Sequence, residues 1–266
     1  MQTPLAVSMG GGVNSISMIV GMAEHGIVPD LIEYADPGRW LEDPAEKPET
    51  YRYMDNHLAP YLARVGFPEL TVVRHERDTL YASCIRNGTL PSKAYGFPGC
   101  SVKFKHQLME SHERKLFGNG YTIAKAIGYH SEETRRSDIE GKDTTHGHYQ
   151  YRYLLREWGW NQADCIAALG RAGLPTPMKS ACYFCPSSKK HEIIWLAENH
   201  PDLFAKAVAM EENAKAYHAE RGGVTKGLGR TFSWSELVQL TPAAVEKVRE
   251  PETIPCMCYD GGDEDE

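Results

Sequence analysis

The 266-residue sequence has no apolar run near the ~20 residues that a membrane-spanning helix requires. It contains neither the Gly-Lys-Ser/Thr ending of a Walker phosphate loop nor the Gly-x-Gly-x-x-Gly dinucleotide motif. Internal repeats are absent, and no low-complexity segment precedes the acidic tail. Because the amino terminus shows no basic and apolar leader, we expect a cytoplasmic protein with no membrane partner.

We also expect no disulfide framework. Seven cysteines are present, and an odd number in a cytosolic chain does not form a disulfide framework. Cys84 and Cys165 lie among apolar residues in helical patterns, so we expect them to be buried packing residues. Metal, cluster or thiol chemistry is the stronger prediction for the others. These are Cys100, Cys182, Cys185, Cys256 and Cys258.

The chain has fewer basic than acidic residues. The net charge is −7, and part of it lies in the acidic tail. This balance argues against indiscriminate binding to nucleic acids, whose phosphates attract basic surfaces. It does not exclude a local basic patch, so a nucleic acid stays open as a partner.

The chain is organised around residues 5–20, where an apolar run, three glycines and a second apolar run follow one another. The first run predicts a buried strand, and the second predicts a packed helix. Glycines allow close approach of the backbone, and a helix N-terminus carries partial positive charge, so the turn favours an anion. Ser8 and Ser15 add hydroxyl donors at its two ends. A tight turn without a ligand is the alternative.

Strands and helices alternate after this turn. We predict strands over residues 29–38, 70–75 and 121–129, an edge strand over 149–155, and helices over 49–62 and 103–117. This order predicts an α/β fold with a parallel sheet and a helical C-terminal part. Ligands of such sheets bind beyond the carboxyl ends of the strands, which places residues 10–15, Asp36 and His75 on one rim.

The turn resembles the pyrophosphate loop, Ser-Gly-Gly-x-Asp-Ser, of the adenine nucleotide alpha hydrolase (PP-loop ATP pyrophosphatase) superfamily. The branch it resembles most is the phosphoadenosine phosphosulfate (PAPS) reductase-like proteins. That branch has Ala-Asp-Thr-Gly followed by Pro-Glu-Thr-Tyr, and this chain has Ala-Asp-Pro-Gly at residues 35–38 and Pro-Glu-Thr-Tyr at 48–51. Asn14 stands where the motif has Asp, which removes a carboxylate that could help to hold Mg²⁺.

The resemblance covers roughly residues 5–186 and implies a Rossmann-like fold that binds ATP, or PAPS or adenylyl sulfate, with Mg²⁺ as an open addition. Glu132 or Glu133 would meet adenine or ribose, and Arg135 or Arg136 would meet phosphate or sulfate. A solvated charged loop is the alternative there. The implied nucleotide-binding residues are Ser8, Gly10, Gly11, Gly12, Asn14, Ser15, Asp36, Gly128, Glu132, Glu133, Arg135 and Arg136.

Three parts follow from this organisation. Residues 1–186 form the predicted nucleotide-binding PP-loop domain, residues 187–254 a helical C-terminal subdomain, and residues 255–266 a cysteine-containing acidic tail. A homodimer is left open.

The Cys-Tyr-Phe-Cys segment at residues 182–185 has a chelating spacing for zinc or an iron–sulfur cluster, and a redox dithiol is the alternative. Upstream, Gly99 and Cys100 resemble the Cys-Cys-x-x-Arg-Lys segment of the cluster-bearing reductases, with glycine in the first place. We therefore expect Cys100, Cys182 and Cys185 to hold a [4Fe–4S] cluster, or Zn²⁺ as the rival.

Two reactions fit this resemblance. In the first, ATP adenylates an acceptor oxygen, pyrophosphate leaves, and sulfur or nitrogen displaces AMP. In the second, a thiol attacks the sulfur of PAPS or adenylyl sulfate. Sulfonucleotide reductases carry a C-terminal Glu-Cys-Gly-Leu-His segment that this chain lacks, and Pro-Cys-Met-Cys at residues 255–258 is its nearest substitute.

We therefore favour sulfur transfer or a related modification of an acceptor, which is a nucleic acid base or backbone or a small molecule. A non-catalytic nucleotide- and metal-binding regulator is the third reading, because Asn14 replaces the usual Asp. The candidate catalytic residues are Asn14, Ser15, Cys256 and Cys258.

Overall fold

The computed structural model describes residues 3–118, 120–133, 145–146 and 148–239. The chain divides into two compact units, each built from several segments. The first unit takes residues 1–35, 48–73 and 107–180, and the second takes residues 36–47, 74–106 and 181–266. The three-part division at residues 186 and 254 stays a prediction.

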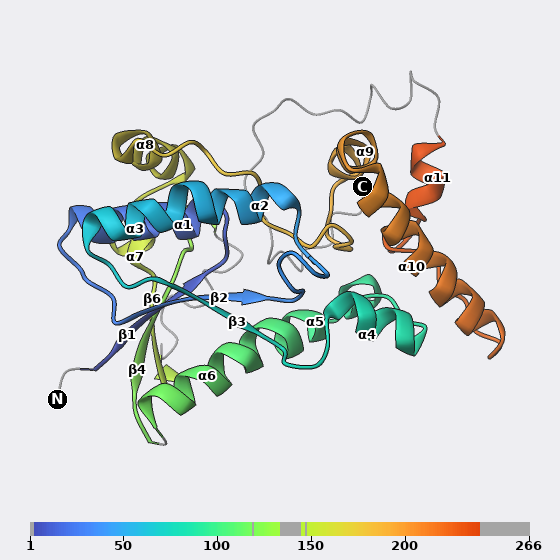
Figure 1. The fold of residues 1–266 in the computed structure, drawn as a ribbon, viewed down its shortest axis with the longest axis horizontal. Coiled ribbons are helices and arrows are strands. Elements are labelled where there is room, and N and C mark those ends of the chain that lie inside the picture. Colours follow the sequence, from blue (N-terminus) through green and yellow to red (C-terminus); the bar gives the residue numbers. More distant parts are fainter. Residues whose placement is uncertain (1–2, 119, 134–144, 147, 240–266) are drawn as a thin grey trace. The chain divides into compact units, whose positions relative to one another are not determined.

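A six-stranded sheet with the order β3-β2-β1-β4-β6-β5 forms the centre of the first unit (Figure 1). Its strands are β1 (Leu5–Met9), β2 (Leu31–Asp36), β3 (Leu70–Arg74), β4 (Ile123–Ile127), β5 (Thr145–His146) and β6 (Tyr149–Arg152). Strand β1 pairs in parallel with β2 and β4, and β4 pairs in parallel with β6, whereas β5 is antiparallel to β6. The predicted α/β fold with a parallel sheet is therefore confirmed.

One strand prediction was wrong. Residues 149–155 do not form an edge strand, because β6 lies between β4 and β5. The strand also ends at Arg152, and a short helix, α7 (Leu154–Glu157), follows. Its two leucines are fully buried, so apolar packing rather than sheet pairing decides this stretch.

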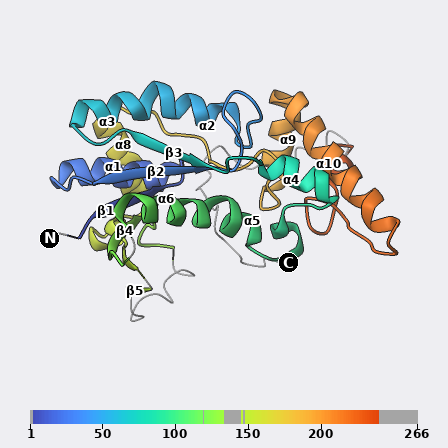
Figure 2. The ribbon, with the colours of Figure 1, turned by 60° about the horizontal axis from the view of Figure 1, so that its bottom comes forward.

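Helices cover both faces of the sheet. The helical segments of this unit are α1 (Val13–Glu24), α2 (Pro48–Tyr53), η1 (Met54–Leu58), α3 (Ala59–Val65), α6 (Gln107–Phe117), α7 and α8 (Gln162–Ala172). Figures 1 and 2 both show α3 and α6 on opposite sides of the strands. Helix α1 is buried from Val13 to Met22, and a Cβ atom added at Gly21 would lie 2.3 Å from the ring of Trp158.

Helix boundaries follow ordinary capping chemistry. Asn161 begins α8 with a capping box, in which its side chain accepts from Asp164 N and the Asp164 carboxylate accepts from Asn161 N. The helix ends at Gly173, whose φ of +71° lies in the left-handed region that glycine tolerates. Asparagine is one of the residue types that favour this first position of a helix.

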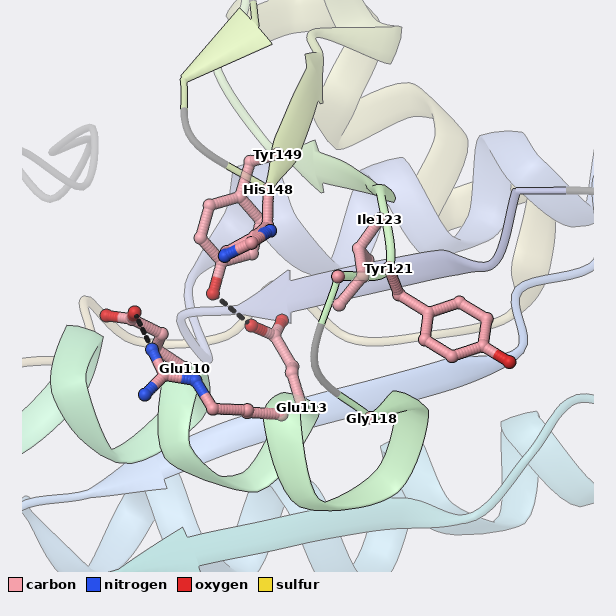
Figure 3. Close-up of a pocket in the computed structure, with 9 residues that line it drawn as sticks. Glu110, Glu113, Gly118, Tyr121, Ile123, His148 and Tyr149 are labelled. Carbon is pink, nitrogen blue, oxygen red and sulfur yellow. Dashed lines mark hydrogen bonds and ion pairs between the residues drawn. The ribbon is translucent and has the colours of Figure 1, made fainter.

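A buried polar layer lies between the sheet and α6. Glu33 and Glu113 are both fully buried. Glu113 also accepts from the Tyr149 hydroxyl at 2.7 Å, as Figure 3 shows, and pairs with Lys125 Nζ at 2.9 Å. His112 Nδ1 lies 2.5 Å from Glu33 Oε1. Burial and the neighbouring Glu113 raise the pKa of Glu33 to about 9, so this carboxyl group keeps its proton at neutral pH.

The second unit is mainly helical within the described residues. Its helical segments are α4 (Leu80–Asn87), η2 (Ser92–Tyr95), α5 (Gly99–Ser101), η3 (Val102–His106), α9 (Lys190–Asn199), α10 (Pro201–Ala219) and α11 (Trp234–Val238). Its apolar core includes Phe184, Met210 and Trp234, all at most 1% exposed. The described residues contain no helix long and apolar enough to cross a membrane.

Candidate nucleotide and thiol sites

The glycine turn leads from β1 into α1, as predicted. Gly11 has a φ of +80°, and a Cβ atom added there would lie 2.9 Å from Met54 Cε and 3.2 Å from Ser180 Oγ. Gly12 caps α1 without a side-chain hydrogen bond, and the first turn of the helix holds no acidic residue. The first N–H groups of a helix have no intrahelical acceptor. The turn therefore presents uncapped N–H groups at the positive end of a helix.

Asn14 and Glu133 lie far apart in the sequence, and the structure brings them together. Asn14 is 7% exposed and donates from Nδ2 to Glu133 Oε1 at 2.6 Å, while its Oδ1 has no hydrogen-bond partner among the described residues. His130 Nε2 lies 3.5 Å from the same Glu133 oxygen, and Arg156 donates to the Glu133 carbonyl. A carboxylate at position 14 would face Glu133 at this distance, so the amide removes a repulsion between like charges.

Gly128 closes over the start of α1. A Cβ atom added there would lie 2.9 Å from Ser15 N and Cα, which is closer than real Cβ atoms come. The Ser15 hydroxyl donates to Gly12 O at 3.1 Å. A glycine at the end of β4 therefore lets this strand end pack on the backbone of the helix start.

Three further predicted residues have other partners. The Ser8 hydroxyl donates to Met109 Sδ on the α6 side of the sheet, so it does not point into the glycine turn. Asp36 belongs to the second unit, where its carboxylate accepts from the N–H groups of Gly38 and Trp40 and stabilises a turn. Glu132 is exposed. Arg135, Arg136, Cys256 and Cys258 lie outside the described residues.

The predicted thiols belong to the second unit, and two of them contact its apolar core. Cys100 and Cys182 both pack against the cluster that contains Phe184. Cys185 N donates to Cys182 O at 3.0 Å, which closes the tight turn of the Cys-x-x-Cys segment. The amide of Cys100 donates to Ser92 Oγ at 2.6 Å. Local hydrogen bonds thus hold the backbone at each thiol.

The surroundings of Cys182 decide how readily its thiol ionises. Burial raises the pKa of Cys182 well above its usual range, and the Glu46 carboxylate and the thiols of Cys185 and Cys100 raise it further, whereas Lys105 lowers it. Glu46 is fully buried and lies 3.6 Å from Lys105 Nζ. Within the described part of the chain, no three histidine, cysteine or carboxylate side chains are already arranged as a metal site.

The two remaining described cysteines are packing residues, as expected. Cys84 is 4% exposed, and burial raises its pKa to about 12. Cys165 is fully buried, and burial raises its pKa to about 12 as well. Their burial among apolar side chains is what a packing role requires.

Sequence reasoning missed the residues that surround these sites. Met54 and Ser180 line Gly11, and Glu46 and Lys105 flank Cys182. One signal was visible for Ser180, which stands two residues before Cys182 in the segment already singled out. Nothing in the spacing of Glu46 and Lys105 indicates that their side chains meet, because 59 positions separate them and their pairing depends on the fold.

No family model matches the chain, and no curated protein sequence matches it. Two solved structures are similar to it in fold. The phosphoadenylyl-sulfate (PAPS) reductase from Candida auris, in a phosphate complex, is 13% identical, with 66% of this chain and 76% of that chain covered and a TM-score of 0.44. The U34-tRNA thiolase NcsA from Methanococcus maripaludis, with its [4Fe-4S] cluster, is 15% identical, with 90% and 82% covered and a TM-score of 0.46.

Proposed function

We propose that this protein is an adenine-nucleotide-dependent enzyme that activates an acceptor by adenylation for sulfur transfer or a related modification. The observation that carries the proposal is the glycine-lined start of α1, which has no side-chain cap, with the part-buried Asn14–Glu133 pair beside it. The first N–H groups of a helix have no intrahelical acceptor, and the Asn14 amide oxygen has no hydrogen-bond partner among the described residues, so this helix start is suited to a phosphate chain with a hydrated cation.

The loop would act on the leaving group. Its N–H groups, fixed by the positive φ of Gly11 and by the close contact of Gly128, would hold the phosphates and stabilise the negative charge that develops on departing pyrophosphate. Donors that are already oriented need no rearrangement during the reaction, so they favour the transition state.

Glu133 would restore the carboxylate that position 14 lacks. Its Oε1 is held by Asn14 Nδ2, and the Asn14 Oδ1 atom stays unpaired. A carboxylate and an amide oxygen are both hard ligands that suit Mg²⁺. The exchange of Asp for Asn at position 14 is therefore compatible with nucleotide chemistry.

Cys100, Cys182 and Cys185 would hold the metal group of the second unit. Thiolates are the ligands that zinc and iron–sulfur clusters take, so the chemistry of these donors fits such a group. An iron–sulfur cluster held there would supply iron that binds sulfur. Lys105 favours the thiolate form of Cys182, which metal binding requires.

Two measurements test this proposal. The first is the release of AMP and pyrophosphate from ATP, with calorimetric titration of ATP into the wild type and Gly11→Val. The β-branched side chain should abolish binding, whereas Gly26→Val, at a glycine with nothing within 4 Å of an added Cβ, is the matched control. Unchanged affinity in folded Gly11→Val would remove the phosphate role.

The second measurement is metal and sulfide analysis after anaerobic purification. Serine at Cys100, Cys182 or Cys185 should each remove the metal, whereas serine at Cys165 should not. A stoichiometric metal that survives the loss of Cys100 would contradict the three-thiol site. A PAPS-dependent thiol oxidation without ATP turnover would instead favour sulfonucleotide reduction.

A further inference from the structure

One N–H group of the glycine turn has an acceptor inside the protein. Gly11 N donates to the Sδ atom of Met9, two residues earlier in the chain, at 2.9 Å. Met9 is the last residue of β1 and is 1% exposed, so this hydrogen bond is buried. Each backbone amide supplies a single donor. The protein itself therefore engages the N–H group of Gly11.

The side chain of Met9 is suited to this contact. Methionine is unbranched, so its thioether can fold back to an amide two residues ahead, as Asp and Asn side chains do in turns. Sulfur is a weak acceptor, but a buried N–H group without any acceptor would cost free energy. The pairing of Met9 with Tyr34 of β2 fixes the backbone from which the side chain starts.

Gly11 is also enclosed where a side chain would begin. A Cβ atom added there would lie 2.9 Å from Met54 Cε and 3.2 Å from Ser180 Oγ, and both residues are 2% exposed. Three buried side chains, from β1, from η1 and from the segment after α8, thus surround this one glycine. The turn is therefore held at a fixed point just before α1 begins.

The N–H groups that remain for an anion lie further along the turn. The backbone bond from Ile16 N to Gly12 O begins the ladder of α1. The N–H groups of Val13 and Asn14 precede it, so they have no acceptor within the helix. Because Gly11 comes directly before this stretch, its bond to Met9 limits the rotation of the backbone that carries these donors.

We infer that Met9 is a positioning residue for the phosphates of the nucleotide. Its thioether holds the amide of Gly11 and so keeps the N–H groups of Val13 and Asn14 directed at the phosphate chain. This inference rests on the proposed function, because it takes a nucleotide as the ligand of the turn. It assigns sulfur as the acceptor for Gly11 and phosphate oxygen as the acceptor for the residues that follow.

The test is calorimetric titration of ATP, pyrophosphate and adenosine into the full-length wild type and Met9→Leu. The variant should fold, because leucine has about the volume of methionine and lacks only the acceptor. It should bind ATP and pyrophosphate about three- to tenfold more weakly, which corresponds to one hydrogen bond. Its affinity for adenosine should stay that of the wild type, because adenosine carries no phosphate. Equal losses for ATP and adenosine would overturn the positioning role.

Met22→Leu is the matched control. Met22 is fully buried in α1, about 15 Å along the helix from Gly12, so this variant should bind all three compounds as the wild type does. Hydrogen exchange of the Gly11 amide, measured by NMR without nucleotide, gives a second readout. Met9→Leu should speed this exchange because it removes the acceptor, and Met22→Leu should not. Unchanged exchange in Met9→Leu would refute the inference, as would tighter ATP binding, which would mean that sulfur competes with phosphate.

These measurements separate the inference from the proposed function. If Met9→Leu weakens pyrophosphate binding but the wild type releases no AMP from ATP, the positioning role stands and adenylation is refuted. If the wild type turns over ATP and Met9→Leu binds ATP with unchanged affinity, the inference fails and the proposed function stands. A wild type that binds neither ATP nor pyrophosphate would overturn both.

Discussion

Replacing Glu33 by Gln should change how stability depends on pH. The pKa of Glu33 rises from its ordinary value of 4.5 to about 9 in the folded protein, because the side chain is buried and faces Glu113. The unfolded chain releases this proton near pH 4.5, whereas the folded chain keeps it. The stabilisation is therefore complete below pH 4.5 and is lost as the pH rises toward 9.

The magnitude follows from proton linkage. Each pH unit between the two pKa values lowers the free energy of unfolding by about 1.4 kcal/mol for one proton held by the folded state alone. Glutamine mimics the protonated carboxyl group in shape and cannot titrate. From roughly pH 6 to pH 9 the variant should therefore gain about 4 kcal/mol relative to the wild type. Because Glu113 is one cause of the raised pKa of Glu33, this value belongs to the pair and not to Glu33 alone.

The assay is urea denaturation of both proteins at several pH values, followed by tryptophan fluorescence. Glu110→Gln is the control, because Glu110 lies on α6, the helix that carries Glu113, with its carboxylate at the surface and paired with Arg114. This control should leave the pH dependence parallel to that of the wild type. Parallel curves for Glu33→Gln and the wild type would refute the raised pKa of Glu33.

Three further results are expected. Asn14→Asp should lower the free energy of unfolding by about 1–3 kcal/mol, because the new carboxylate is repelled by Glu133. Adding Glu133→Gln should restore most of this loss. Additive losses in the double-mutant cycle would exclude a direct contact between the two side chains. Gly128→Val should abolish ATP binding in a folded protein, because the valine side chain would displace the start of α1. Normal ATP affinity of this variant would show that the contact between Gly128 and Ser15 is dispensable. Alkylation by iodoacetamide at neutral pH should be slow for Cys182 and Cys165 in the metal-free native protein, because burial raises the pKa of both thiols. Rapid labelling of either cysteine would contradict its raised pKa.

The sequence alone determined the elements whose signals are local. Three glycines between two apolar runs predict a strand, a turn and a helix, and the structure confirms β1 and α1 at these positions. Asn161 and Ser233 predict helix starts for the same reason, because a capping side chain bonds to backbone only two or three residues away. The alternation of such elements was enough to predict a parallel α/β sheet.

The tertiary structure alone decided which distant side chains meet. Asn14 with Glu133, Glu33 with Glu113 and Cys182 with Glu46 are pairs that no sequence period links. The prediction of an edge strand over residues 149–155 was wrong for the same reason. The neighbours of a strand depend on the order of the strands in the sheet and not on the strand's own residues. Burial is known only after folding as well, and burial is the main cause of the raised pKa of Glu33.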